Sequence, residues 1–145
     1  MLNSGESQKV VIRPDFNRSI MMDFQGAKIT SDVGFLLVRE IDERFRIIDP
    51  MGNCLKDLRS YTHTKHSLIQ MVRQRVYQIA AGHEDCNDTD YLRIYPALRL
   101  ALDKGHKAGA SRSMLSRLEN DVLGNAKGLE ALDSALTRTT DALLI

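Results

Sequence analysis

The 145-residue sequence contains no tryptophan, three prolines and two cysteines, and aromatic residues make up only 6% of the chain. A hydrophobic core must therefore consist mainly of aliphatic side chains and methionine. Cys54 and Cys86 lack neighbouring Cys or His residues at metal-ligand spacing, which argues against a zinc site and against a disulfide-framed domain. No apolar run approaches the roughly 18 residues of a membrane span, and the N-terminus has no signal-peptide pattern. We therefore expect a cytoplasmic protein without membrane contacts.

Charged residues are abundant, at 27% of the chain, and they nearly balance at a net charge of +1. Their distribution is uneven. Residues 61–120 carry nine basic and six acidic side chains, whereas residues 121–145 carry two basic and four acidic ones. A polyanionic partner would therefore be met by the middle third of the chain.

The apolar patterning predicts a mainly α fold with a short N-terminal β-hairpin or extended arm. Residues 1–9 are polar and are predicted to be a disordered tail. The alternating stretches of residues 10–30 predict the hairpin or arm, with Gln25-Gly26 as a candidate tight turn. We expect residues 10–125 to form one helical domain and residues 126–145 to form a further helix.

The first helix is predicted to begin at Thr30-Ser31-Asp32, where hydroxyl and carboxylate groups suit a helix N-terminus. Glu40 and Arg44 are expected to pair on its solvent-facing side. Its buried stripe is predicted from a spacing of four residues and comprises Val33, Leu37, Ile41 and Phe45, with Leu36 beside them.

A longer helix is predicted from Ser67 to Ala81. Ser67 and Gln70 match the capping-box pattern, and Gly82 suits a left-handed C-terminal cap. The apolar residues at helical spacing are Leu68, Ile69, Val72, Val76, Ile79 and Ala80. The polar residues Arg73, Gln74, Arg75 and Gln78 lie off this stripe and are expected to face solvent.

The last predicted helix has an apolar stripe that reaches the end of the chain without the usual capping residues. Either this stripe docks against a partner, or the chain is part of something longer, and we favour the second interpretation. The stripe consists of Leu129, Leu132, Leu136 and Leu143.

An acidic turn follows Gly82 and does not fit a calcium loop, because Asp90 occupies the required glycine position and Pro96 the position of the final glutamate. A role as helix caps, with Arg93 close enough to pair, fits better. The structural residues of this motif are Glu84, Asp85, Asn87, Asp88 and Arg93. The histidines at 63, 66 and 83 share no helical face with one another, so a metal site is not predicted.

The segment 110–119 has the composition of a recognition helix, with hydroxyls and arginines first and apolar anchors after them. Its candidate DNA contacts are Ser111, Arg112, Ser113 and Arg117. The preceding helix and loop would complete a helix-turn-helix with an unusually long turn. An ordinary capped surface helix is the alternative. Arg73 and Arg75 are further candidates, but they point about 200° apart on their helix, so at most one contacts DNA.

Four ordered blocks resemble the N-terminal region of bacterial insertion-sequence transposases of the DDE superfamily, group 1. Tyr95 and Arg112 depart from that family's usual pattern, in which Asp and Gln tend to stand at these positions. The blocks are TSDVGFLLVREIDER (30–44), HSLIQMVRQRVYQIAAGHEDCNDTDYLR (66–93), PALRLAL (96–102) and ASRSMLSRLEN (110–120).

The resemblance implies that the parent enzyme cuts and joins DNA with Mg²⁺ held by three carboxylates in an RNase H-like domain downstream of this region. No catalytic or metal-ligating residue is then expected in this chain, which would need no cofactor. Its expected function is to bind the terminal inverted repeats of a transposon as double-stranded DNA, to position subunits in a homo-oligomer, or both. The alternative is a helical scaffold domain with no direct DNA contact.

Overall fold

The computed structural model describes residues 11–23, 33–60, 62, 64–105 and 107–144. Its elements confirm a mainly α fold with an N-terminal hairpin. In chain order they are β1 (Val11–Ile12), β2 (Met22–Asp23), α1 (Gly34–Phe45), α2 (Ile48–Cys54), α3 (Leu68–Ala80), α4 (Thr89–Leu92), α5 (Pro96–Ala101), α6 (Arg112–Arg117), the π-helical turn η2 (Leu118–Leu123) and α7 (Ala126–Leu143).

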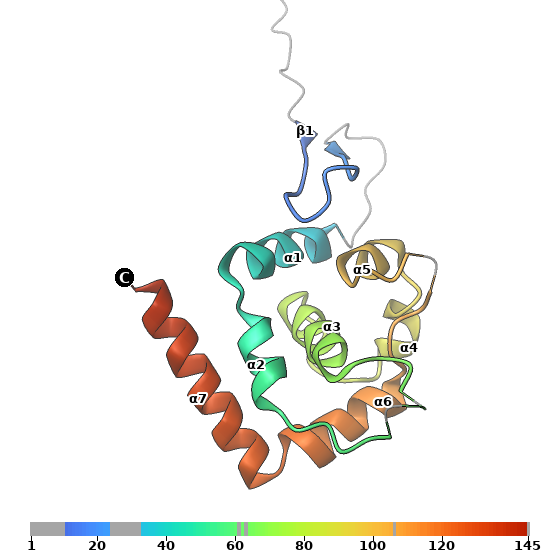
Figure 1. The fold of residues 1–145 in the computed structure, drawn as a ribbon. Helices are drawn as coiled ribbons and strands as arrows, with labels where there is room; N and C mark the ends of the chain where they lie inside the picture. The colour runs from blue at the N-terminus through green and yellow to red at the C-terminus, as the bar shows by residue number, and fades with distance from the viewer. Residues whose placement is uncertain (1–10, 24–32, 61, 63, 106, 145) are drawn as a thin grey trace, which may run out of the picture.

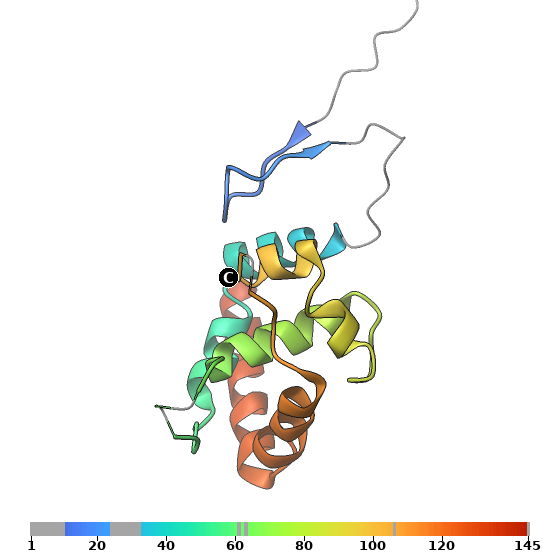
Figure 2. The same cartoon turned by 90° about the vertical axis from the view of Figure 1, so that its right-hand side faces the viewer.

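Helix α3 is the centre of the molecule, and the other helices surround it (Figure 1). Helices α1 and α2 pack directly against it, α5 packs on α1, and α7 packs on the outer side of α2. The two-stranded hairpin extends beyond α1, away from the helical body (Figure 2). Among the described residues, no helix combines the length and apolar character needed to cross a membrane.

The ends of α3 form as the sequence predicts. The Ser67 hydroxyl accepts a hydrogen bond from the Gln70 amide at 3.3 Å, and the Gln70 side chain accepts one from the Ser67 amide at 3.2 Å. Gly82 has a φ of 94°, a left-handed conformation that costs glycine little. These caps fix the length of the central helix.

The prediction that the polar residues of α3 face solvent is wrong for three of them. Gln74, Arg75 and Gln78 are buried, whereas Ile79 is about half exposed. A central helix has neighbours on nearly every side, so its polar side chains are buried too and need internal partners. Gln74 has two, because its side chain accepts from the Ala110 amide at 2.7 Å and donates to the Ala110 carbonyl at 3.0 Å.

The predicted buried stripe of α1 is wrong at three positions, whereas Leu36 is buried as predicted. Leu37, Ile41 and Phe45 are 45–51% exposed, and the buried face includes Arg39 and Asp42 beside Phe35 and Leu36. Both sets of residues have helical spacing, so periodicity alone could not choose between them. The charged face is buried because its side chains find partners on other segments.

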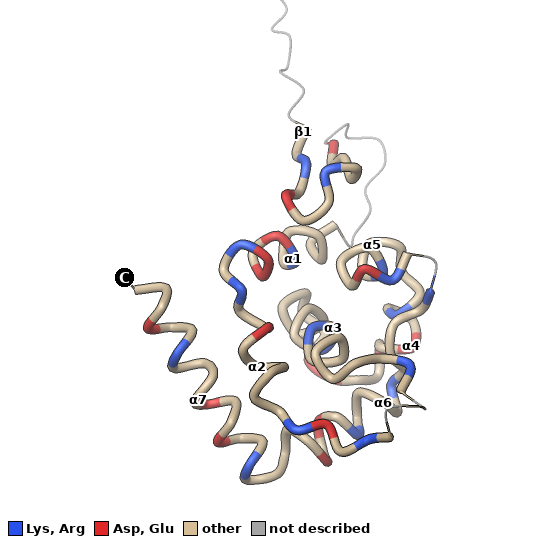
Figure 3. Tube along the Cα trace, viewed as in Figure 1, with Lys and Arg blue, Asp and Glu red and all other residues tan. Residues whose placement is uncertain are grey.

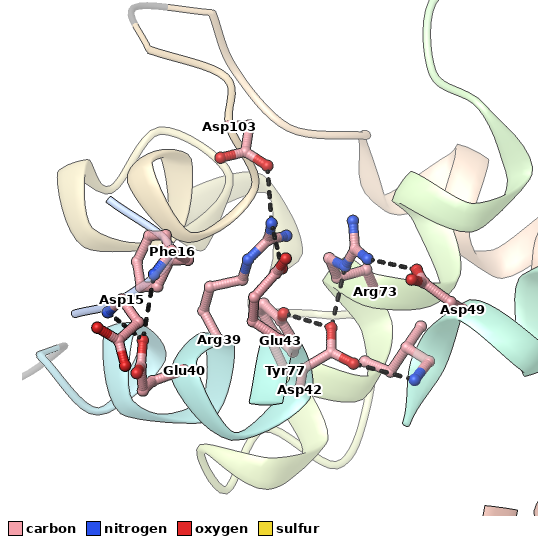
Figure 4. A network of polar contacts seen from close by, with 11 residues as sticks. Asp15, Phe16, Arg39, Glu40, Asp42, Glu43, Asp49, Arg73, Tyr77 and Asp103 are labelled. Atoms are coloured by element: carbon pink, nitrogen blue, oxygen red, sulfur yellow. Dashed lines mark hydrogen bonds and ion pairs between the residues drawn. The ribbon is translucent and has the colours of Figure 1, made fainter. Parts of the chain in front are cut away.

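Asp42 connects three helices through one carboxylate (Figure 4). It accepts hydrogen bonds from the Ile48 amide at the start of α2 (2.9 Å) and from two α3 side chains, the Arg73 guanidinium (3.1 Å) and the Tyr77 hydroxyl (2.7 Å). Arg73 also donates to Asp49 at 2.8 Å. Burial, followed by the hydrogen bond from its hydroxyl to Asp42, raises the pKa of Tyr77. This network explains how a charged residue of α1 is stable in the interior.

The N-terminal hairpin is joined to α1 by the neighbouring charged residues. Glu40 accepts from the amides of Asp15 and Phe16, at 2.7 and 3.4 Å, instead of facing solvent as predicted. Arg39 lies over the Phe16 ring and pairs with Glu43 and Asp103 (Figure 4). The segment between the two strands therefore packs on α1. The predicted tail 1–9, the Gln25-Gly26 turn and the Thr30–Asp32 cap lie outside the described residues.

The C-terminal half follows its predicted pattern more closely. Pro96 is the first residue of α5, and Leu98, Ala101 and Leu102 are buried as predicted. Leu115 and Leu118 are buried beneath α6 and η2. The Asn125 side chain caps α7 by accepting from the Gly128 amide at 2.8 Å. The proposed division between 10–125 and 126–145 stays a prediction.

Candidate nucleic-acid interface

The predicted recognition residues lie at the start of α6. Arg112, Ser113 and Arg117 are exposed, Ser111 is half-buried, and the buried side chain of Leu115 anchors the helix. The Arg112 amide donates to Asp90 at 3.2 Å, so the beginning of α6 lies against α4. Neither the Arg112 nor the Arg117 side chain forms an ion pair with the described part of the chain.

The predicted helix-turn-helix arrangement is wrong. Helix α5 packs on α1 and lies at the opposite end of the molecule from α6 (Figures 1 and 2). The long connection between them runs past α4, where the Gly109 amide donates to the Arg93 carbonyl at 2.9 Å. Helix α6 is thus a surface helix, and its exposed first turn is supported by α4 and α3.

Both candidate arginines of α3 bind acceptors inside the protein. Arg73 is committed to Asp42 and Asp49. Arg75 is 5% exposed, and its guanidinium binds the Glu119 carboxylate and the backbone carbonyls of His83 and Glu84. Arg75 is therefore bound to internal acceptors and is not part of the proposed interface.

The acidic turn makes local contacts that fit a structural role. The Asp85 carboxylate accepts from the backbone amide and side-chain amide of Asn87, at 2.7 and 2.8 Å. Asp88 precedes α4 without capping it, and its carboxylate meets the His83 ring at 3.0 Å. Arg93 forms an ion pair with Asp90 at 3.9 Å, as predicted for this motif.

Basic side chains from three segments act electrostatically on His66, and we call Arg59, Lys65, His66, Arg93 and Lys104 the His66 cluster. Burial lowers the pKa of His66, and the positive charges of Lys104, Arg93, Lys65 and Arg59 lower it further. Burial and the nearby Lys107 likewise lower the pKa of Lys104. The cluster is therefore a place where like charges converge.

Hydrogen bonds hold this cluster at the N-terminal end of α3. The Arg59 guanidinium donates to the His66 carbonyl at 3.2 Å. The Lys104 ammonium donates at 2.8 Å to the Gln70 side-chain oxygen, the atom that also receives the Ser67 amide in the capping box. Acceptors at the start of the central helix, the His66 carbonyl and the Gln70 side chain, thereby position two of the five basic side chains.

A groove of about 840 Å³ lies between α6 and the segment that carries Arg59 and Lys65. Its lining includes the basic side chains of Arg59, Lys65 and Arg117, the acidic side chains of Asp57 and Asp121, and apolar side chains such as that of Leu118. Blue segments from several stretches of chain accordingly follow the right-hand edge of the molecule between α5 and α6 (Figure 3). We call the His66 cluster, Lys107, Arg112 and Arg117 together the basic edge.

The sequence did not indicate most of the basic edge. Arg59, Lys65 and Lys104 belong to irregular segments that share no periodic pattern. The only available signals were the excess positive charge of residues 61–120 and the Lys-His pair at 65–66. Folding brings these side chains together, and no spacing rule relates them.

Residues 12–142 match the family described as Transposase DDE domain group 1. The chain belongs to this family. Membership indicates a role in DNA transposition and, in general terms, an interaction with DNA. Comparisons with curated proteins and with solved structures gave no match.

In this chain the sequence blocks that carry the family resemblance contact one another. Arg75 of the second block pairs with Glu119 of the fourth, and Gln74 pairs with the Ala110 backbone. Asp42 of the first block binds Arg73 of the second. The conspicuous charged residues of these blocks thus form the internal polar framework of the fold.

The described residues do not fit a divalent metal centre. They contain no group of three or more His, Cys, Asp or Glu side chains placed to hold a metal ion. Asp42, the most buried carboxylate of the network, already accepts from Ile48, Arg73 and Tyr77. We therefore derive no step through Mg²⁺ from these residues.

Proposed function

We propose that this transposase-family chain binds double-stranded DNA at the terminal inverted repeats of a transposon, through the basic edge. The observation that carries the proposal is that Arg117 of α6 lines one groove with Arg59 and Lys65, while Arg112 and Arg117 form no ion pair within the described part of the chain. A DNA backbone presents a regular line of phosphates, which such an edge complements over several contacts.

Within the basic edge, α6 would carry the contacts closest to the bases. Arg112 and Ser113 are exposed at its start, with Ser111 beside them, while buried Leu115 and Leu118 hold the helix in place. A guanidinium binds either a phosphate or the paired acceptors of a guanine edge. Arg117 lines the groove and would contact a phosphate.

The proposed function does not include strand cleavage by these residues. We propose that this chain needs no cofactor of its own and that the Mg²⁺ chemistry of transposition belongs to a catalytic domain elsewhere. Incubation with plasmid DNA and Mg²⁺ or Mn²⁺ should give no nicked product. Metal-dependent nicking that is lost in the Asp85→Ala, Asp88→Ala double variant would refute this part of the proposal.

A gel-shift series tests the DNA-binding proposal. Affinity for inverted-repeat DNA should fall steeply between about 50 and 200 mM salt, because each neutralised phosphate releases about 0.9 counterion. Arg112→Ala and Arg117→Ala should each reduce the salt slope by about one if they contact phosphate, and cost about 1–3 kcal/mol if they read a base edge. Arg138→Ala on α7 is the matched control and should change neither quantity.

The same experiment separates the alternative function. Equal, weak and salt-insensitive binding to inverted-repeat and scrambled DNA would remove the DNA-binding proposal. A helical scaffold domain with no direct DNA contact would then be the better description.

We also propose that α7 mediates a homo-oligomer. Three leucines of α7 are 46–56% exposed and recur every seven residues, the spacing along which two helices pack in a coiled coil. They are Leu129, Leu136 and Leu143. The helix spans about 27 Å, enough for several such contacts. Light scattering should give more than one copy per particle for the unchanged chain and a monomer for Leu136→Lys. A monomer in both cases at high concentration would refute the proposal.

A further inference from the structure

Helix α1 carries a row of large apolar side chains on its outer face. Leu37, Ile41 and Phe45 follow one another at intervals of four residues and are 45–51% exposed, and we call them the α1 outer stripe. The buried residues of α1 lie on the opposite side of the helix, which packs on α3 and α5. A contiguous apolar row of this kind on a protein surface marks an interaction site.

The free charges beside the α1 outer stripe are positive. Arg44 lies three residues after Ile41 and therefore on the same face of the helix. Arg46 follows at the left-handed residue that ends α1. Both arginines are exposed, and neither forms an ion pair within the described part of the chain. The exposed acidic residue of this helix, Glu43, is already paired with Arg39. The stripe is therefore matched to an apolar partner surface with negative charge beside it.

The three exposed leucines of α7, which we call the α7 stripe, have that character. Asp133 lies four residues after Leu129 and three before Leu136, so it shares their face of the helix. Its carboxylate is exposed and forms no ion pair among the residues that the structure describes. The basic residues of α7, Lys127 and Arg138, lie roughly 160–180° around the helix from Leu129. The α7 stripe is thus apolar with a negative charge on its own face.

We propose that the α7 stripe of one copy packs on the α1 outer stripe of a second copy, with Asp133 pairing with Arg44 across the contact. This inference rests on the proposed homo-oligomer and names the surface that α7 binds. Packing of α7 on α7 brings two Asp133 carboxylates towards each other. Packing of α7 on α1 instead places opposite charges beside the apolar contact, which favours this arrangement over the other.

The lengths and positions of the two helices suit a closed pair with two-fold symmetry. The α1 outer stripe is roughly 12 Å long, and Leu136 and Leu143 are separated by roughly 10 Å along α7. Both views show the C-terminal end of α7 near the C-terminal end of α1, so one partner can reach both helices (Figures 1 and 2). A two-fold axis repeats the α1–α7 contact and leaves no stripe open to further copies. Stable interfaces use about 20–30 residues per partner, which two helix pairs approach more closely than one.

Sedimentation equilibrium of the full chain tests the role of α1. Ile41→Lys should give a monomer, as Leu136→Lys should, because either substitution buries a charge in the apolar contact. Ile94→Lys is the matched control, since Ile94 is similarly exposed but follows α4, and it should leave the dimer intact. Circular dichroism of all three variants should match that of the unchanged chain, because each replaced side chain is about half exposed.

A charge exchange tests the pairing of the two helices directly. Arg44→Glu and Asp133→Arg should each weaken association about threefold to tenfold, because each substitution places like charges in contact. The double variant should recover the dissociation constant of the unchanged chain to within about twofold. Losses that add in the double variant would overturn the inference. So would an unchanged dissociation constant in Arg44→Glu, which is the result that packing of α7 on α7 predicts.

Failure of this inference is distinguishable from failure of the proposed oligomer. If Leu136→Lys gives a monomer while Ile41→Lys and Arg44→Glu leave the dimer unchanged, α7 mediates the oligomer without binding α1. If the unchanged chain is a monomer at high concentration, the proposed homo-oligomer is wrong and this inference with it. The DNA-binding proposal is tested separately, by the salt dependence of the gel shift.

Discussion

The arginines of α3 and the basic residues of the basic edge have opposite surroundings. Arg73 and Arg75 lie on the central helix, and each has a carboxylate partner and little exposure. Arg112 and Arg117 lie at the periphery and form no ion pair with the described residues. Arg73 and Arg75 therefore stabilise the fold, whereas Arg112 and Arg117 are available to bind a partner. Substitutions in both sets of residues test this contrast.

The largest effect should come from Asp42→Ala, which removes the carboxylate shared by α1, α2 and α3. Arg73 would keep only the half-exposed Asp49, and the Tyr77 hydroxyl would be buried without its acceptor. Loss of one partner of a buried ion pair costs about 3–5 kcal/mol of unfolding free energy, measured by urea denaturation. Asp49→Ala is the control and should cost less than about 1 kcal/mol. Equal losses for both would show that Asp42 is not the central acceptor.

The contrast itself is tested by replacing one arginine from each class with methionine. Arg75→Met should cost about 3 kcal/mol of stability, because it leaves Glu119 and two carbonyls without their donor. Arg112→Met should change stability by less than about 0.5 kcal/mol and instead weaken DNA binding. Thermal unfolding and gel shift on both variants give the comparison. A stable Arg75→Met protein with impaired DNA binding would reverse the assignment.

Tyr77→Phe should have a smaller effect on the same network. Loss of a hydrogen bond to a charged acceptor costs about 1.5–3 kcal/mol near neutral pH. Because the folded-state pKa of Tyr77 is raised above 10, its contribution is complete below pH 10 and is lost as the pH rises further. Alkaline unfolding curves should thus separate the unchanged protein from Tyr77→Phe. Tyr91→Phe, at an exposed position, should behave like the unchanged protein.

The smallest expected effect concerns His66 in the absence of DNA. Its folded-state pKa is lowered by burial and by four positive charges, so the unfolded chain takes up this proton first as the pH falls. Stability is therefore complete above about pH 6.5 and decreases as the pH falls below it. His66→Gln should remove this part of the acid dependence in denaturation curves recorded at low salt. Identical acid profiles for both proteins would show that the surrounding charges are too well screened to matter.

Several features were predictable from the sequence because local physics decides them. The capping box of Ser67 and Gln70, the left-handed Gly82 and the start of α5 at Pro96 depend on residues close together in the chain. The helix content and the buried anchors Leu115 and Leu118 follow from periodicity. Family membership can also be inferred from the sequence, because the ordered motifs are recognisable without knowing which residues they contact.

The burial of charged residues was decided by the tertiary structure alone. In α1, Leu37 and Ile41 are as apolar as the residues that are buried, yet the face with Arg39 and Asp42 is the one that packs inward. That choice depends on partners such as Arg73 and Asp103, which are tens of residues away. Local propensity contains no information about such partners.

The candidate site could not be predicted in full for the same reason, because its residues come from segments that are far apart in the sequence. The sequence by itself determined that the middle third is basic and that α6 begins with hydroxyls and arginines. Only the tertiary structure decided that Arg75 is internal and that Arg59, Lys65, Arg93 and Lys104 act electrostatically on His66. Burying an arginine is tolerable only where folding supplies a carboxylate, and a cluster of like charges arises only where folding brings separate segments together.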